Sequence, residues 1–209
     1  MQFPTPRAAL ILLGVTIAAW LIAEGFELSD WLALRAGFVP ARVTGPQVLG
    51  AVPVWLTPLT ATLIHGGIIH LGFNMLMLAY CGRFVEYALG PWGVIILYVA
   101  GAYAAAVFQY LAGPTILIPM VGASGAISAL VGAYALLYSQ RRGAAAHSGR
   151  WGHWLHVLWL AAGWIVVQLL VALATTATHI SIAVAAHIGG FIAGLLLARP
   201  LLLWRYRKA

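Results

Sequence analysis

The sequence predicts an all-α polytopic membrane protein, a bundle of six transmembrane helices, and three observations support this fold class. First, 63% of the 209 residues are hydrophobic and only 7% are charged, whereas about a quarter of the residues in soluble domains are charged. Second, the apolar residues gather in six runs, each near the ~20 residues that cross a bilayer. Third, a water-exposed surface cannot be built with only four acidic residues, which are Glu24, Glu27, Asp30 and Glu86.

The six runs are expected to form one membrane domain over residues 1–209. They lie at about 8–24, 64–82, 91–111, 122–139, 154–174 and 182–198. The longest connection, 25–63, contains two of the four acidic residues, with Glu24 directly before it, and several prolines and tryptophans. An amphipathic segment broken by prolines is expected to lie in the membrane interface rather than to cross the membrane. The spans have no repeat that would favour an inverted-repeat transporter.

The positions of the basic residues predict the orientation. With six spans, both termini lie on one side, and if that side is the inner one, nine basic residues are inside and two, Arg35 and Arg42, are outside. This distribution follows the positive-inside rule, and it explains the pI near 10.1 without nucleic acid. In a bacterium, the protein would lie in the inner membrane with both termini in the cytoplasm. The inner residues are Arg7, Arg83, Arg141, Arg142, Arg150, Arg199, Arg205, Arg207 and Lys208.

The second, fourth and sixth runs would all pass from outside to inside, so their first residues share the outer half of the membrane. Polar side chains within a span are costly, and they usually face one another or a cavity. Helices that are far apart in sequence therefore bring a set of polar groups to one depth. These groups are His65, His70 and Asn74 on the second run, Ser124 on the fourth and His187 on the sixth.

Ser124 has two interpretations. It could be a small residue that allows helices to pack closely. It could instead be a nucleophile, because it stands at an expected helix N-terminus, where free backbone N–H groups can bind an anion. The preceding apolar loop is interrupted by Pro114 and Pro119, so the helix is expected to begin below the membrane surface. The motif is not G-x-S-x-G, because position 126 is alanine.

His187 is either a structural hydrogen-bonding residue or the base that activates a serine. Gly190 and Gly194 form a G-x-x-x-G face on the same helix, which permits a close approach to a neighbouring helix. A close contact between the fourth and sixth runs would bring His187 Nε2 near Ser124 Oγ.

No acidic residue is positioned to complete a catalytic triad. Asp30 lies in the long loop, and Glu86 follows the second run on the inner side. We interpret Glu86 as structural, either paired with Arg83 or capping the third span. A serine hydrolase built on this chain would therefore use a Ser–His dyad, and we expect slow turnover because a third group normally orients the imidazole.

The stretch HGGIIHLGFNM, residues 65–75, contains the remaining polar groups. His70 and Asn74 are four residues apart and share one helix face, whereas His65 is expected in the turn before the helix. The pair could form hydrogen bonds between helices, or it could form an oxyanion hole with the Ser124 backbone N–H. A zinc-protease site is disfavoured, because H-E-x-x-H is absent and no acid is near. Haem ligation by His70 and His187 is disfavoured because it would need a roomy pocket.

These motifs resemble the rhomboid intramembrane serine proteases. The pattern consists of H-x-x-x-x-H-x-x-x-N (His65, His70, Asn74), G-x-S-G (Gly122, Ala123, Ser124, Gly125) and A-H-x-x-G-x-x-x-G (Ala186, His187, Gly190, Gly194). The order and spacing also match, over about residues 55–200. The resemblance implies a rhomboid-like bundle, in which Gly122 allows a tight loop before the serine and His65 has a supporting role.

The resemblance further implies catalytic roles for the matching positions. Ser124 would be the nucleophile and His187 the general base, while His70 and Asn74 would line the oxyanion hole. The family is similar in that it uses no cofactor and cleaves transmembrane protein substrates near their outer ends. The chain would be a minimal bacterial member of the six-span type.

Two positions depart from the family pattern. Many members have Trp-Arg in the loop before the second span, where this chain has Trp55-Leu56. Many also have an aromatic residue four positions after the serine, stacked on the histidine, where this chain has Ser128. The departures leave open an alternative, a non-catalytic rhomboid-like protein that binds client membrane helices. A channel is disfavoured because the polar groups gather in one leaflet, and an aspartyl protease because Asp30 is the only aspartate.

Overall fold

The computed structural model describes residues 5–46, 48–138, 155, 157–166 and 183–207, and within these ranges the chain is built from helices. Their only β-structure is one isolated bridge, between Phe38 and Met120. The predicted all-α class is therefore confirmed for the described residues. The elements are α1 (Arg7–Gly25), α2 (Ser29–Ala36), η1 (Pro40–Arg42), α3 (Thr57–Thr60), η2 (Ala61–Leu63), α4 (Ile68–Ala112), α5 (Ser124–Tyr138), the helical segment Val157–Val166 and α7 (Val184–Arg205).

Each predicted apolar run contains a helix, and α4 contains two of the runs. Its two halves meet at Gly90, where φ is 76° and ψ is 174°, and Pro91 follows directly. A positive φ is readily adopted by glycine, and proline lacks the N–H that would continue the helix. Three helices, α1, α4 and α7, are long and apolar enough to cross a membrane, whereas α5 and Val157–Val166 are shorter. The rest of the fifth run, 154–174, lies largely outside the described residues, so six crossings remain a prediction.

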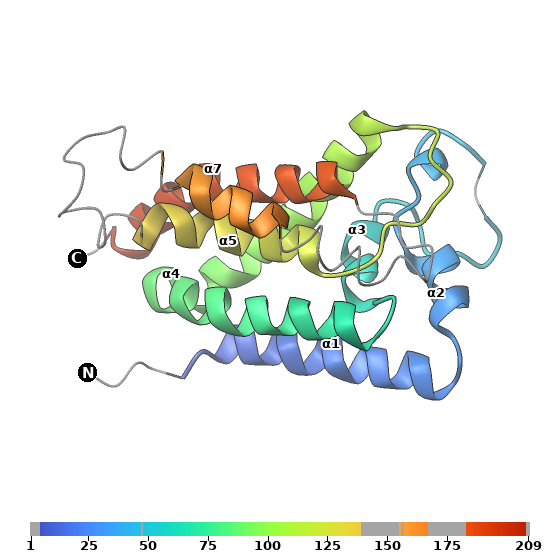
Figure 1. Ribbon diagram of the computed structural model, residues 1–209, viewed down its shortest axis with the longest axis horizontal. Coiled ribbons are helices and arrows are strands. Elements are labelled where there is room, and N and C mark those ends of the chain that lie inside the picture. The colour runs from blue at the N-terminus through green and yellow to red at the C-terminus, as the bar shows by residue number, and fades with distance from the viewer. Residues whose placement is uncertain (1–4, 47, 139–154, 156, 167–182, 208–209) are drawn as a thin grey trace.

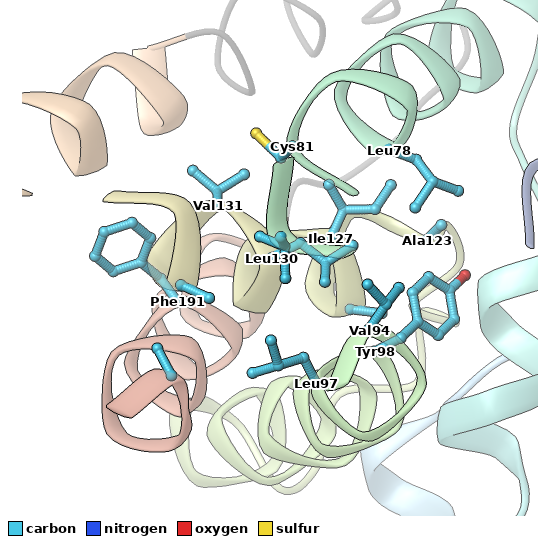
Figure 2. Packing of buried hydrophobic residues seen from close by; sticks show 14 of the residues in the cluster. Leu78, Cys81, Val94, Leu97, Tyr98, Ala123, Ile127, Leu130, Val131 and Phe191 are labelled. Carbon is cyan, nitrogen blue, oxygen red and sulfur yellow. The ribbon is translucent and has the colours of Figure 1, made fainter. Parts of the chain in front are cut away.

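Helix α5 lies at the centre of the described bundle. Ile127 and Leu130 are fully buried, and they pack between the two halves of α4 and against α7, as Figure 2 shows. Leu78 comes from the first half of α4, Leu97 from the second half and Phe191 from α7. The helix that begins with Ser124 is therefore held on three sides.

The contact between α5 and α7 is close enough to exclude a Cβ atom at two glycines of α7. A Cβ at Gly190 would collide with the carbonyl oxygen of Gly125, and one at Gly194 with the carbonyl oxygen of Ala129. The predicted close approach of the fourth and sixth runs is confirmed. Small residues on both helices bring the two backbones into contact, as in many membrane bundles.

Glu86 is structural, but its partner differs from the expected one. Its carboxylate accepts hydrogen bonds from the backbone N–H groups of Ala8 and Ala9, at 3.0 and 2.9 Å. This partner, the start of α1, was not among the expected ones, which were Arg83 and the third span. The first N–H groups of a helix lack intrahelical acceptors and attract negative charge, so this carboxylate caps α1 from a residue far along the chain.

Arg205, at the end of α7, binds the main chain at and next to Glu86. Its Nη1 donates to the carbonyl oxygens of Glu86 and Tyr87, at 3.2 and 2.7 Å. These carbonyls belong to the last turn before the break at Gly90, where helical acceptors lose their usual donors. The start of α1, the break in α4 and the end of α7 thus meet at one end of the bundle, opposite α2 and α3 (Figure 1).

The loop 25–63 contains four short helical elements and has its own internal ties. Arg42 is buried and its Nη2 donates to the carbonyl oxygen of Val52 at 2.7 Å, while Thr60 Oγ1 donates to that of Ala36 at 2.6 Å. Large apolar side chains remain exposed on this loop, in keeping with the predicted interfacial position. They include Phe26, Trp31, Leu34, Leu49 and Trp55.

Candidate active site

The chain before α5 is fixed by backbone hydrogen bonds to two distant segments. Phe38 and Met120 exchange a pair of N–H to C=O bonds, at 3.0 and 2.8 Å. Gly122 N–H donates to the carbonyl oxygen of Ala61 at 2.9 Å. Buried irregular backbone needs hydrogen-bond partners from the protein itself, and these bonds supply them. The position of the residues just before Ser124 is therefore set by the first loop and by η2.

Gly122 allows a histidine ring to approach the main chain. Its φ is +108°, which non-glycine residues rarely adopt. A Cβ built at this position would lie 2.7 Å from Cε1 and 2.8 Å from Nε2 of His70. Both the backbone conformation and the space therefore require glycine. The consequence is that the His70 ring lies against the chain two residues before Ser124.

Ser124 and His187 are in hydrogen-bond contact. Ser124 Oγ and His187 Nε2 are 2.8 Å apart, and both residues are buried. Ser124 is the first residue of α5, and His187 lies in the first turn of α7, where its N–H donates to the carbonyl oxygen of Ala183. In this geometry an imidazole can accept the hydroxyl proton, which is the requirement for activating a serine.

The two other predicted histidines contact the chain just before the serine. His65 lies in the turn before α4, which begins at Ile68, and its Nε2 accepts the N–H of Ala123 at 3.4 Å. The His65 and His70 rings meet edge to face, with centroids 5.1 Å apart. His70 Nδ1 accepts the N–H of Gly66 at 3.4 Å. That bond favours the tautomer in which the hydrogen is on Nε2, the atom beside Gly122.

Asn74 is buried one turn after His70 on the same face of α4. Its Nδ2 donates one hydrogen to the carbonyl oxygen of His70 at 2.9 Å, and an amide nitrogen carries a second hydrogen. The first turn of α5 adds backbone N–H groups, because its first hydrogen bond to a carbonyl is from Ile127 to Ala123. The structure thus brings His65, His70, Gly122, Ser124 and His187 together, with Asn74 beside them.

Two further residues of the site, Ser128 and Trp164, have roles that sequence reasoning did not assign. Trp164 Nε1 donates to Ser128 Oγ at 2.7 Å, and Ser128 Oγ donates to the carbonyl oxygen of Ser124 at 2.7 Å. The Trp164 ring lies 6.4 Å from the His187 ring, at 70° to it. An aromatic side chain therefore contacts the histidine although position 128 is serine, and it comes from a different helix.

Helical periodicity could have identified the inward face of this segment. Val157 and Trp164 are buried, Leu160 and Ala161 pack against the core, and these four positions follow the i, i+3, i+4, i+7 pattern of one helix face. The pattern could not have identified the partners, because the contact with Ser128 depends on how three helices cross.

A helical bundle with a buried Ser–His pair and apolar helices long enough to span a bilayer defines an integral membrane protein with a candidate hydrolase site. A family model described as Rhomboid domain matches residues 53–204, well over half of the chain. The chain therefore belongs to the rhomboid family. It is also similar to the rhomboid protease GluP of Bacillus subtilis (strain 168), with 37% identity over 84 residues. That match covers 40% of this chain but only 16% of the relative's length.

Proposed function

We propose that this protein is an intramembrane serine endopeptidase that cleaves transmembrane-helix substrates near their outer ends. The observation that carries the proposal is the 2.8 Å contact between Ser124 Oγ and His187 Nε2 at the first turns of two packed helices. Membership of the rhomboid family and the protease name of a partly matching relative support the same class of reaction.

The reaction would proceed by acyl transfer. Ser124 Oγ attacks the carbonyl carbon of the scissile peptide bond while His187 Nε2 takes the hydroxyl proton. The C–N bond then breaks, and the imidazolium gives this proton to the leaving amine. In the second half, His187 takes a proton from water, the hydroxide attacks the ester, and Ser124 regains its proton as the acid product leaves. No cofactor is required for these steps.

The negative charge that develops on the substrate oxygen would be stabilised by neutral donors. The candidates are His70 Nε2–H beside Gly122, the second hydrogen of Asn74 Nδ2 and the backbone N–H of Ser124. Preorganised donors in a site that excludes water contribute strongly to catalysis, since they do not need to reorganise when the charge appears.

The imidazole would act without a carboxylate partner. Glu86 is engaged with α1, and the other three acidic residues lie in or between α1 and α2. The third member of a triad normally orients the histidine and stabilises its protonated form. We therefore propose a Ser–His dyad with slow turnover.

Substrates would reach the site sideways from the lipid, because both catalytic side chains are buried among helices. A helical peptide bond is hydrogen-bonded and resists attack, so we propose substrates with small or helix-breaking residues near the outer membrane surface. In the orientation that places the site near the outer membrane surface, both termini would lie in the cytoplasm of a bacterial cell.

The test compares wild type with Ser124→Ala and His187→Ala on a single-span substrate that has a helix-breaking juxtamembrane segment. We expect cleavage by wild type and loss of detectable product in both variants, because each removes one partner of the proton transfer. Gel bands report the products, and mass spectrometry locates the cut. Ser29→Ala is the matched control: it removes an α2 hydroxyl that donates to Glu24, away from the site, and the variant should cleave like wild type.

Two results would overturn the proposal. One is equal cleavage by wild type and both variants, which would trace the activity to a contaminating protease. The other is no cleavage by the folded wild-type protein across several substrates in liposomes, together with retained binding of those helices, which would favour a non-catalytic client-binding protein.

A further inference from the structure

Four contacts link Ser124, His187, Trp164 and Ser128 in a closed ring. Ser124 Oγ meets His187 Nε2, the His187 ring meets the Trp164 ring, Trp164 Nε1 binds Ser128 Oγ, and Ser128 Oγ binds the carbonyl oxygen of Ser124. We propose that Trp164 is a positioning residue that holds the His187 imidazole in line for proton transfer, and that Ser128 anchors it. This inference rests on the proposed function, because it assigns a task to Trp164 within that reaction.

The histidine needs such a partner because no carboxylate orients it. The Trp164 and His187 rings are inclined by 70°, the edge-to-face arrangement that aromatic quadrupoles favour. A ring held in this position restricts rotation of the imidazole about its side-chain bonds. Restricting the base to one orientation keeps Nε2 directed at Ser124 Oγ, and effects of orientation on rate are large.

Trp164 is itself held in one orientation by hydrogen bonding. It is 5% exposed and Ser128 is 0% exposed, so neither group has water as an alternative partner. The Ser128 hydroxyl has one hydrogen, which it donates to the carbonyl oxygen of Ser124, and its oxygen accepts the indole N–H. Turning the indole would leave a buried N–H without an acceptor, which is unfavourable. The Ser128 hydroxyl thus fixes the orientation of the Trp164 ring, which contacts the His187 ring edge to face.

The segment Val157–Val166 contacts the site through this side chain. Its outward residues Leu158 and Trp159 are 62% and 77% exposed, whereas Trp164 points into the bundle. Trp159 is therefore a matched control: it is the same residue type, on the same helical segment, directed away from the site.

The experiment measures two rates for wild type, Ser124→Ala, Trp164→Ala, Trp164→Phe, Ser128→Ala and Trp159→Ala. The first is covalent labelling of Ser124 by a fluorophosphonate probe as a function of pH, which reports the nucleophile and its base without a substrate helix. The second is cleavage of a single-span substrate, resolved into kcat and KM. Thermal unfolding of each purified variant gives the folded fraction.

We expect Trp164→Ala to lower the labelling rate and kcat on the order of tenfold to a hundredfold, as for a misplaced catalytic group. KM should stay within about twofold, because the ring contacts the base and not the substrate. The pH of half-maximal labelling should also move, since it reports the protonation of His187. Trp164→Phe and Ser128→Ala should have smaller losses in the same direction, and Trp159→Ala should match wild type.

A merely structural role would give a different pattern. If labelling by Trp164→Ala falls only in proportion to its folded fraction, and the pH of half-maximal labelling is unchanged, the inference is wrong. The proposed function fails separately: in that case wild type and Ser124→Ala would be labelled equally. Labelling that depends on Ser124 but not on Trp164 would overturn the positioning role alone.

Discussion

At the scale of single residues, the site depends on one glycine as much as on its polar groups. Gly122 has a φ of +108° and no side chain, and the His70 ring occupies the space where a Cβ would lie. Gly122 packs against His70, a proposed oxyanion-hole donor, and lies two residues before the proposed nucleophile Ser124. A single added methyl group at this position therefore affects both the backbone and the histidine.

Gly122→Ala should reduce cleavage sharply. Alanine in this left-handed conformation costs about 1–2 kcal/mol, and its Cβ would also displace His70. We expect kcat to fall on the order of tenfold or more, with a lower Tm. Gly14→Ala is the control, because a Cβ at Gly14 in α1 meets nothing within 4 Å, so activity should be unchanged and Tm should not fall. Wild-type kcat in Gly122→Ala would contradict the role given to this loop.

The sequence could identify several of these residues but not all of them. Ser124, His187, His70 and Asn74 stand in motifs whose order and spacing are specific, and the structure brings all four to one place. Trp164 has no motif, and its importance depends on a hydrogen bond across two helices. Side-chain partners that are set by helix crossing leave no signal in a single sequence.

At the scale of elements, the ends of helices are tied by residues that are distant in sequence. The Glu86 carboxylate caps the start of α1, and Arg205 caps the end of the first half of α4. Most helix ends in the described residues were predicted to within a few residues. The largest differences are at C-terminal ends: the first half of α4 continues to the break at Gly90 instead of ending at 82, and α7 continues to Arg205 instead of ending at 198. The second run was expected to begin at residue 64, but α4 begins at Ile68 because Gly67 has a φ of +135°.

Glu86→Gln should lower stability more than activity. Each carboxylate oxygen now accepts one N–H of α1, and an amide would direct its own N–H₂ group at one of those donors. Losing one charge-assisted bond in a buried position costs about 1–3 kcal/mol. We expect a lower Tm in detergent, measured by circular dichroism, with kcat of the folded fraction close to wild type. Glu27→Gln, at an exposed position, should not change Tm. Equal Tm values for both variants would contradict the capping role.

At the scale of the whole molecule, the polar groups are divided between two ends. Helices α5 and α7 begin at the end of the bundle where α2 and α3 lie (Figure 1), and their first turns carry the Ser–His pair. The break in α4, with the contacts between Arg205 and the Glu86 carbonyl, lies at the other end. The basic residues of the described chain follow the same division, with Arg205 and Arg207 at the second end and Arg35 and Arg42 in the first loop. By the positive-inside rule, we propose that the site lies in the outer half of the membrane.

Cysteine labelling in intact bacterial cells tests this orientation. In a Cys81→Ala background, which removes the single native cysteine, Asp30→Cys should react with a membrane-impermeant maleimide. Arg207→Cys should react only after the cells are permeabilised, because it lies on the cytoplasmic side in this orientation. Both replaced positions are exposed, so differences in reactivity report sidedness and not burial. The reverse pattern would exclude the proposed topology.

The separation of Ser124 and His187 along the chain has a consequence for biosynthesis. The two residues are 63 positions apart and lie on different helices. At about 5–20 residues per second, a ribosome adds the histidine roughly 3 to 13 seconds after the serine. During that interval the nascent protein would have a nucleophile without its base. Proteolytic competence would therefore begin only when α7 inserts beside α5, which would spare neighbouring membrane helices while the chain is still being made.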